Sequence, residues 1–268
     1  HARAMRKNTS NLSAYDFLLR GKYFLNDWRG SREDIVKARE MFEHAIELDP
    51  GYAAAYAGLA GAYVVEIEKG WTKSPEKLGE RALDLARKAV SLDGRDSWVH
   101  LVLAFTYREV KSDYELAEAQ VRTAIELNPN HYWNYCFKSW LSTCSGDLEE
   151  GIFCGNEAIR RNPLLPDSCL QSMVFAEYLA GRYEQAIETF GKMLHPTNWV
   201  QACLAASYAQ LGRDDHAHRA ADDYRKLIGD KISNIEDWNS HWSDLLKFKD
   251  SAALDHFLEG MSKAGLPG

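Results

Sequence analysis

The sequence lacks several features that would each point to a common class of function. No apolar run approaches the roughly 20 residues that a membrane-spanning helix needs. The net charge of −7 provides no excess of positive charge for binding DNA or RNA. No strand pattern precedes a glycine-rich turn of the kind that holds a nucleotide phosphate. We therefore expect this segment to make no membrane contact and to bind neither nucleic acid nor a cofactor.

No two cysteines form a CxxC pair, so the cysteines do not suggest a metal site or a redox motif. The five positions are Cys136, Cys144, Cys154, Cys169 and Cys203. All fall within or beside segments with helical periodicity, where a reduced cysteine packs as a small apolar residue. The sequence therefore predicts reduced cysteines, in the core or at interfaces of a cytoplasmic protein.

Residues 38–63 hold the pattern around which the rest of the chain is organised. Apolar residues, among them Phe42 and Ala45, recur at the spacing of one helical face. Pro50 ends this helix, because it has no N–H to donate and disfavours helical geometry at the residue before it. A second helix follows, with small residues such as Ala60 where a partner helix must come close. The stretch predicts two helices joined by a sharp corner.

Copies of this corner recur along the chain. AIELDP at 45–50 is matched by AVSLDG at 89–94, by AIELNP at 124–129 and by AIRRNP at 158–163. Each copy lies at the end of a segment with helical periodicity and is followed by another such segment. The sequence is therefore a tandem array of helix pairs.

The array resembles the tetratricopeptide repeat, a helix–turn–helix of 34 residues with small residues at its contacts and proline at its corner. The resemblance covers roughly residues 14–230. It implies an all-α fold, a right-handed α-solenoid of about six helix pairs with a C-terminal helical cap. Residues 1–13, which begin with His1 and not with Met, are expected to be a linker or the remnant of a tag. Residues 231–268 are expected to form the capping helices that cover the last apolar face.

Two amphipathic helices are expected in this tail. Trp238 and Trp242 lie on one face of the first, over residues 234–249. The second is expected to start near Ser251 and to end at Gly265.

Two local features each allow two interpretations. Trp71 lies in a long loop inside the second repeat, and it either folds over the helix pair or contacts a partner. Gly151 and Gly155 fall inside a helix, where each costs roughly 1 kcal/mol relative to alanine. Glycine at these positions either lets helices approach closely or makes the superhelix soft at that point.

Three segments carry a narrower resemblance. AYDFLLRGKYFL at 14–25, AREMFEHAIELDPGYAAAYAGLA at 38–60 and FKDSAALDHFLEGMSKAGLPG at 248–268 look like the C-terminal repeat region of bacterial class III adenylate/guanylate cyclases. Similar regions follow winged-helix DNA-binding domains in some bacterial regulators. In cyclases of this kind the catalytic domain is N-terminal, and its metal-binding aspartates have no counterpart in this chain. The resemblance therefore implies a signalling role but no catalytic residue in this segment.

His216 and His218 form the only paired-histidine motif. On a helix, residues two apart point about 200° from each other, so the two rings cannot share a metal ion. With Asp214 and Asp215 beside them, they are expected on a polar outer face. The sequence thus predicts no catalytic, cofactor-binding or metal-binding residue.

In tetratricopeptide arrays the first helices of the repeats line a concave groove, so the resemblance implies a binding surface there. The family's groove-facing position near the start of the first helix falls on Trp in three of the five repeats compared. Trp, Tyr and Arg are common anchors of protein contacts. The candidate groove residues are Trp98, Phe105, Arg108, Glu109, Trp133, Trp140, Tyr178 and Trp199. The alternative is that the tryptophans pack between adjacent repeats as core.

One class of ligand can be tested against the sequence. Tetratricopeptide domains that bind the C-termini of chaperones use a carboxylate clamp of Lys, Asn and Arg on the groove helices. The corresponding positions are Leu18, Lys22, Gly58, Trp98 and Val102. Since only Lys22 could act as a cation, a clamp for a terminal carboxylate is not expected.

The predicted function is that of a non-catalytic interaction or regulatory module, the C-terminal part of a bacterial nucleotide cyclase involved in cyclic-nucleotide signalling. The expected partner is a protein or peptide, or other domains of the parent chain. The alternatives are the effector domain of a winged-helix transcription regulator and a self-association module that forms a homodimer. Enzymatic activity of the segment itself is not expected.

Overall fold

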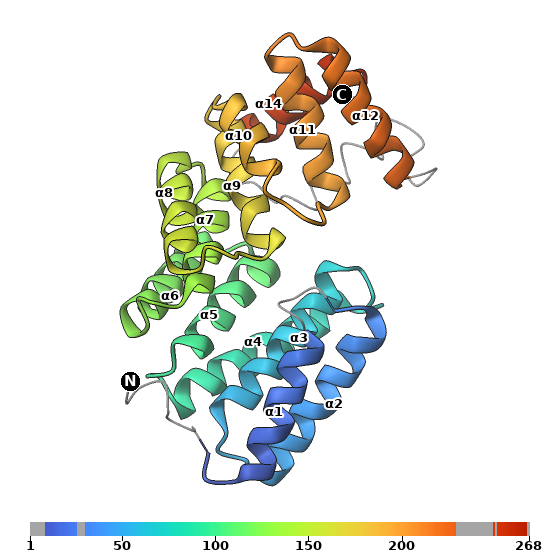
Figure 1. Ribbon diagram of the computed structural model, residues 1–268. Coiled ribbons are helices and arrows are strands. Elements are labelled where there is room, and N and C mark those ends of the chain that lie inside the picture. Colours follow the sequence, from blue (N-terminus) through green and yellow to red (C-terminus); the bar gives the residue numbers. More distant parts are fainter. Residues whose placement is uncertain (1–8, 26–29, 229–248, 250, 267–268) are drawn as a thin grey trace. The chain divides into compact units, whose positions relative to one another are not determined.

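The computed structural model describes residues 9–25, 30–228, 249 and 251–266. These residues form α-helices joined by loops, without any strand (Figure 1). The expectations for residues 1–8 and for a helix carrying Trp238 and Trp242 fall outside the described residues.

The chain divides into two compact units, residues 1–129 and residues 130–268. The helices of unit 1 are α1 (Leu12–Leu25), α2 (Arg32–Leu48), α3 (Ala53–Glu68), α4 (Pro75–Leu92), α5 (Ser97–Thr106), the π-helical turn η2 (Tyr107–Lys111) and α6 (Tyr114–Leu127). The helices described in unit 2 are α7 (Tyr132–Ser145), α8 (Leu148–Arg161), α9 (Asp167–Leu179), α10 (Tyr183–Phe190), α11 (Asn198–Gln210), α12 (Asp214–Ile228) and α14 (Ser251–Lys263). The expected array did not include this division, because the repeat pattern continues through it.

Helices pair in the order that the repeats predict. In unit 1, α1 packs on α2, α3 on α4 and α5 on α6; in unit 2, α7 packs on α8, α9 on α10 and α11 on α12. Within each unit, the first helix of a repeat also packs on both helices of the repeat before it, as α3 does on α1 and α2. The expected fold class, an all-α tetratricopeptide-type solenoid of about six helix pairs, is confirmed in the described residues.

The helix ends follow local chemistry. Ser31 and Asp34 form a capping box at the start of α2, in which the Ser31 hydroxyl accepts the Asp34 N–H and the Asp34 carboxylate accepts the Ser31 N–H. At the other end, Asp49 Oδ1 accepts the Gly51 N–H at 3.0 Å and holds the corner at Pro50. The predicted corner between the first two helix pairs is therefore present.

Phe42 of α2 is the central packing residue of the first two repeats. Its ring is fully buried between glycines of two different helices, Gly21 of α1 and Gly58 of α3. A Cβ atom at Gly21 would stand 2.5 Å from this ring, and one at Gly58 would overlap it. The small residues therefore give space to an aromatic ring that joins one repeat to the next.

Gly151 and Gly155 in α8 have the same role. A Cβ atom at Gly151 would stand 2.6 Å from Thr143 Oγ1 of α7, and one at Gly155 would overlap Met173 of α9. The Ser139 hydroxyl of α7 also donates to the Gly151 carbonyl at 2.7 Å. Of the two interpretations of these glycines, close approach of the helices is confirmed.

Trp71 is partly buried and packs against the core of unit 1. The backbone N–H of Trp71 donates to the Glu66 carbonyl at 2.9 Å, and the Trp71 carbonyl accepts a hydrogen bond from Arg32 Nη2 at 3.4 Å. The loop therefore folds over its own helix pair, as the first of the two interpretations predicts.

The expectation that all cysteines are reduced is wrong for two of them. Cys136 of α7 and Cys169 of α9 form a disulfide, with Cα atoms 5.1 Å apart, whereas Cys144, Cys154 and Cys203 form no disulfide and are buried. The paired residues are 33 positions apart, close to one repeat length, so stacking of successive repeats places them on neighbouring helices. Pairing across repeats leaves no short spacing such as CxxC in the sequence.

Candidate protein-binding surface

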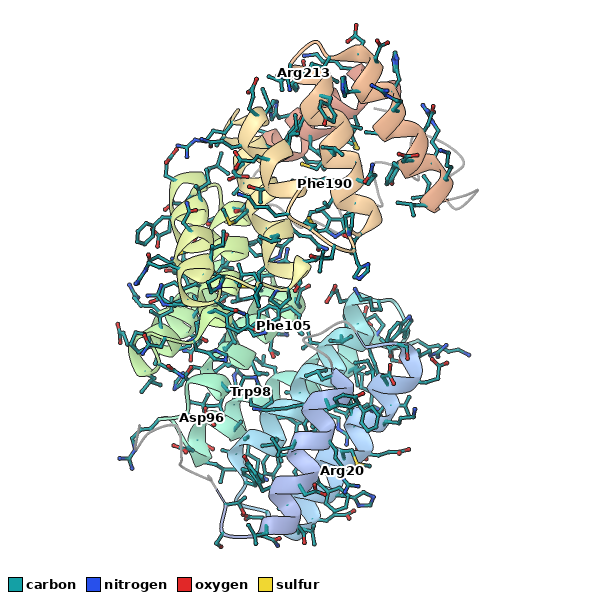
Figure 2. All side chains as sticks on the ribbon, viewed as in Figure 1. Arg20, Asp96, Trp98, Phe105, Phe190 and Arg213 are labelled. Carbon is teal, nitrogen blue, oxygen red and sulfur yellow. A yellow bond between two sulfur atoms is a disulfide. The ribbon has the colours of Figure 1, made fainter. Side chains whose placement is uncertain are left out.

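Lys22 and Trp98 meet on the first helices of unit 1. The Lys22 ammonium group lies 3.6 Å from the centroid of the Trp98 ring, a cation–π contact. The Asp96 side chain caps α5 by accepting a hydrogen bond from the backbone N–H of Trp98 at 2.9 Å, and this bond orients the start of that helix. Figure 2 labels Asp96, Trp98 and Phe105 along α5.

Helix α3 makes the contact between Lys22 and Trp98 possible. Lys22 belongs to α1 and Trp98 to α5, and α3 packs against both helices. From Ala53 to Val65 every residue of α3 is buried, and most are alanine or glycine. Because these side chains are short, the long Lys22 side chain can cross α3 and reach the ring of the next repeat.

Burial lowers the pKa of Lys22 to about 8, while the nearby negative charge of Asp96 opposes the shift. At neutral pH the group is still mostly protonated, so it meets the Trp98 ring as a cation. The sequence singled out Lys22 only as a partial match to a carboxylate clamp. In the structure its ammonium group instead contacts an aromatic ring of its own unit.

Phe105 is partly buried and packs against the core of unit 1, on the same helix as Trp98. Arg108 and Glu109, expected on the groove, are both interior residues with 3% and 6% exposure. Arg108 Nη1 donates to Glu109 Oε1, so the two charges pair with each other. Their expected place on an open surface is corrected, since the chain turns these side chains inward at η2.

The π-helical turn η2 explains this placement. Ala89 and Ala124 are 35 positions apart, whereas Ala124 and Ala158 are 34 apart, so the third repeat carries one extra residue. A π-helical turn takes up one residue more than an α-helical turn. Side chains after Thr106 therefore rotate away from the direction that a regular helix predicts.

Three aromatic rings form a cluster on the first helices of unit 2. The Phe175 centroid lies 6.3 Å from that of Trp140 and 5.4 Å from that of Trp199, and the two tryptophan centroids are 5.7 Å apart. Both tryptophans are partly buried and pack against the core of unit 2. Trp133 lies apart from this cluster and stacks on Tyr132 at 6.1 Å. Of the two alternatives, an open stripe and inter-repeat core, neither is settled by this arrangement, and both stay predictions.

Tyr178 is fully buried, which corrects its expected exposure on the groove. It lies on α9 as expected, but α14 covers it: the Tyr178 ring stacks on His256 at 5.1 Å, and its hydroxyl donates to the His256 carbonyl at 3.1 Å. The part of α9 that carries Tyr178 is thus covered by the chain's own helix.

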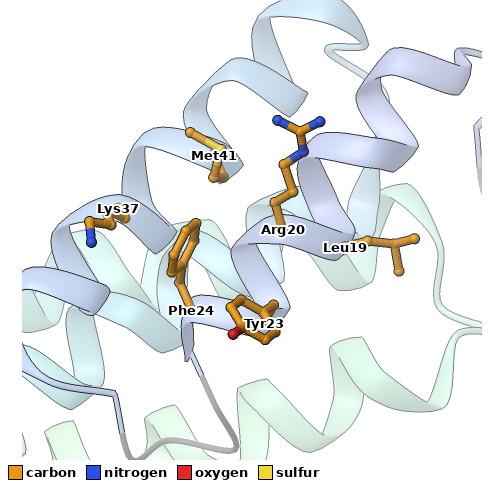
Figure 3. A pocket seen from close by; sticks show the side chains of 6 residues that line it. All are labelled: Leu19, Arg20, Tyr23, Phe24, Lys37 and Met41. Atoms are coloured by element: carbon orange, nitrogen blue, oxygen red, sulfur yellow. The ribbon is translucent and has the colours of Figure 1, made fainter.

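A surface pocket of about 530 Å³ lies between α1 and α2 (Figure 3). Its lining residues are Leu19, Arg20, Tyr23, Phe24, Lys37 and Met41. Two of its apolar side chains are well exposed, Leu19 at 47% and Tyr23 at 79%. The pocket is therefore an apolar surface with a basic rim.

This pocket was not among the expected features, although the repeat register contains a signal for it. Aligning Gly21 of α1 with Ala60 of α3 places Leu19 opposite Gly58 and Tyr23 opposite Ala62. Gly58 is buried against the second helix of the repeat before it. In the first repeat the same register positions carry large side chains on an exposed surface.

His216 and His218 have different neighbours, as the helical geometry predicts. The His216 ring lies 5.1 Å from Tyr208, whereas His218 lies near Gly265. Within the described ranges no three His, Cys, Asp or Glu side chains gather as a set of metal ligands. In the same residues, no helix has the length and apolar character needed to cross a membrane.

Comparison with known proteins gives partial relatives. No family model matches the chain. "Putative adenylate cyclase 3" of Rhizobium meliloti (strain 1021) is 33% identical over 92 residues, which cover 34% of this chain and 15% of that protein. "Superkiller protein 3" of Schizosaccharomyces pombe is 25% identical over 236 residues, which cover 84% of this chain and 16% of that protein. The chain thus spans about a sixth of the length of these curated relatives.

Solved structures share the fold. PilW, described as a widely conserved type IV pilus biogenesis factor, has a TM-score of 0.63 at 15% identity and covers 81% of this chain and 94% of its own. PilF of Pseudomonas aeruginosa has a TM-score of 0.61 at 19% identity, covering 86% and 97%. A tetratricopeptide repeat protein from Parabacteroides merdae has a TM-score of 0.53 at 15% identity, covering 96% and 94%. The chain therefore has the tetratricopeptide-type fold, which other proteins use as a scaffold for protein interaction.

Proposed function

We propose that the chain is a protein-interaction module of a longer bacterial signalling protein of the nucleotide cyclase type. The observation that carries this proposal is the 33% identity over 92 residues to the rhizobial protein named as an adenylate cyclase. In this proposal the segment performs no catalysis, and cyclisation of the nucleotide belongs to another part of the longer protein. Residues 14–230 act as the interaction array and residues 231–268 as its helical cap.

The binding surface in this proposal follows the first helices of the repeats. In unit 1 it includes Trp98 and Phe105, with Lys22 as the neighbouring cation. In unit 2 it includes Trp133 and the cluster of Trp140 and Trp199. Rigid aromatic side chains of this kind are frequent anchors for a protein or peptide segment. The partner is either a separate protein or another domain of the same longer chain.

The test is cyclase activity of the longer protein that contains this chain. Replacing Trp98 by Ala removes an anchor, and we expect the rate of cyclic-nucleotide formation to change by at least about fivefold, the lower end of typical coupling between sites. Leu164→Ala is the control, because this side chain is 89% exposed and in a loop. A winged-helix domain in place of a cyclase domain in the longer protein would instead support the transcription-regulator alternative.

The proposal includes a cytoplasmic location, on which the disulfide has a direct bearing. Disulfides are rare in reducing compartments, and the Cys136–Cys169 bond lies within unit 2. Alkylation of cell extracts before and after reduction measures whether the two thiols are free in the cell. Free thiols would agree with a cytoplasmic protein, and a persistent disulfide would argue for an oxidising compartment.

Self-association is the second candidate function, and the pocket between α1 and α2 favours it. An exposed apolar pocket rimmed by Arg20 and Lys37 is typical of an interaction surface. We expect sedimentation to show a dimer that Tyr23→Glu dissociates and that Leu164→Glu leaves intact. A wild-type chain that sediments as a monomer at tens of micromolar would exclude this candidate.

A further inference from the structure

The last described helix, α14, occupies a different position from the stacked helices before it. Within unit 2, α9 packs on both helices of the preceding pair, α7 and α8. A further stacked helix would pack in the same way on α11 and α12. Instead α14 packs on α11 and, over a smaller contact, on α9, the first helices of two successive repeats (Figure 1). It therefore lies across the surface on which the sequence places the groove.

The apolar contact follows one face of α14 and continues to Ala264, directly after its end. Phe257, Met261 and Ala264 are completely buried. Gly260, which lies between Phe257 and Met261 in the sequence, is also buried. These four positions have the spacing i, i+3, i+4 and i+7. This is the spacing by which an amphipathic helix anchors in the groove of another protein.

Two of these positions fit the surface below them closely. The Phe257 ring lies edge-on to Phe175, with centroids 4.9 Å apart, and to Tyr178, with centroids 5.8 Å apart. A Cβ atom at Gly260 would overlap the Tyr178 hydroxyl and stand 3.0 Å from Ala206 Cβ of α11. The surface therefore accepts an aromatic ring at the first position and no side chain three residues later.

Polar contacts fix the direction of α14. The Tyr178 hydroxyl donates to the His256 carbonyl near the middle of α14, and Lys263 Nζ donates to Gln210 Oε1 at 3.0 Å at its end. Beyond that end, Arg225 of α12 donates to the Gly265 carbonyl. Because these contacts differ between the middle and the end of the helix, they select one orientation of α14.

We propose that the fifth repeat (α9 and α10) and the sixth repeat (α11 and α12) form a helix-binding site whose resident occupant is α14. A partner helix with the same anchors, an aromatic residue at i, glycine at i+3 and Met at i+4, displaces α14 when it binds. The inference rests on the proposed function as an interaction module and adds the ligand class. Because α14 is tethered, its effective concentration is on the order of millimolar, so it keeps the site closed to weak ligands.

The experiment uses the full chain and a labelled peptide of residues 249–266, with binding measured by fluorescence anisotropy. Gly260→Leu in the chain places a side chain against Tyr178 and releases α14. We expect the Gly260→Leu chain to bind the peptide at least about tenfold more tightly than the wild-type chain does. Asp255→Ala in the chain is the matched control, because Asp255 is an exposed residue of α14, and this chain should behave like wild type.

Specificity is tested with a second peptide. A peptide carrying Phe257→Ala loses its aromatic anchor and should bind the Gly260→Leu chain at least about tenfold more weakly than the unchanged peptide. Equal binding of the two peptides would overturn the assignment of the site. A folded Gly260→Leu chain that binds neither peptide would show that α14 is a fixed part of the fold.

Hydrogen exchange distinguishes the release of α14 from unfolding of unit 2. In the Gly260→Leu chain we expect faster exchange in α14 and unchanged protection in α11. Loss of protection in both helices would overturn the proposal, because α14 would then be required for the fold of unit 2. Since every measurement uses this chain alone, a negative result leaves the proposed link to a cyclase untouched.

Discussion

The two units use one repeat pattern but cover their first helices in different ways. In unit 1 the central helix α3 carries short side chains, and Lys22 crosses it to contact Trp98. In unit 2 the first helices carry Phe175 and Tyr178, and α14 covers them. Short side chains thus accompany a single long side chain in unit 1, and aromatic rings accompany a whole helix in unit 2.

The largest expected effect is a loss of stability in unit 1 that leaves unit 2 unchanged. Phe42→Ala removes a buried ring that lies between Gly21 and Gly58, so it should destabilise unit 1 by about 3–5 kcal/mol. Native-state hydrogen exchange should show this loss in α1 to α3 but not in α9 to α14. Phe153→Ala is the control, because Phe153 is 57% exposed. Equal loss of protection in both units would mean that they unfold as one.

Reduction of the disulfide should change the stability of the other unit, unit 2. Breaking the Cys136–Cys169 bond should lower the stability of unit 2 by about 2–4 kcal/mol, because the reduced unfolded chain gains conformational freedom. Thermal unfolding with and without a reductant measures the effect, and a Cys136→Ser, Cys169→Ser double variant should not respond to the reductant. An unchanged melting temperature on reduction would contradict a stabilising role.

Ala60→Leu tests the packing of the repeats in unit 1. Ala60 is fully buried in α3, which packs on α2, α4 and α5. A larger side chain should overpack this contact and cost about 1–3 kcal/mol, measured as a lower denaturation midpoint. An unaltered midpoint would mean that the repeat register is wrong.

The smallest expected effect concerns Lys22 and has a defined pH dependence. Its pKa is about 8 in the folded chain and 10.5 when unperturbed, so between these values the folded state binds fewer protons and its stability rises with pH. Lys22→Met should increase stability at pH 7 by about 1–2 kcal/mol, less than the full shift implies because the cation–π contact is lost. The gain should shrink as pH rises from 8 to 10.5.

Chemical denaturation at several pH values measures this difference. Lys37→Met is the control, because the Lys37 side chain is 53% exposed, and its effect should stay within about 0.5 kcal/mol. A gain from Lys22→Met that stays constant up to pH 10.5 would show that the ammonium charge is not the cause.

Much of the local structure could be predicted from the sequence. The corner at Pro50 depends on residues close together in the chain and occurs where expected, and the capping box at Ser31 is equally local. The interpretation of Gly151 and Gly155 stayed open, because the sequence does not show what fills the space beside a glycine. Thr143 and Met173 provide that answer through packing.

The candidate surface was only partly predictable. Trp98 and Phe105 lie on α5 as the register implies, but Arg108 and Glu109 turn inward after one extra residue. Tyr178 lies on the expected helix, yet its exposure depended on a helix far along the chain. The pocket at Leu19 and Tyr23 becomes apparent only when the first repeat is aligned with the second.

The sequence by itself determined the helix pairs, their order and their tetratricopeptide-type packing, because repeat periodicity, corners and small residues act within one or two repeats. The tertiary structure decided which surfaces are covered: the disulfide between α7 and α9, the contact of Lys22 with Trp98, and the place of α14 on α9 and α11. These features join residues on different helices, some of them far apart in the chain. Such contacts depend on the shapes of facing surfaces, which no periodicity in the sequence encodes.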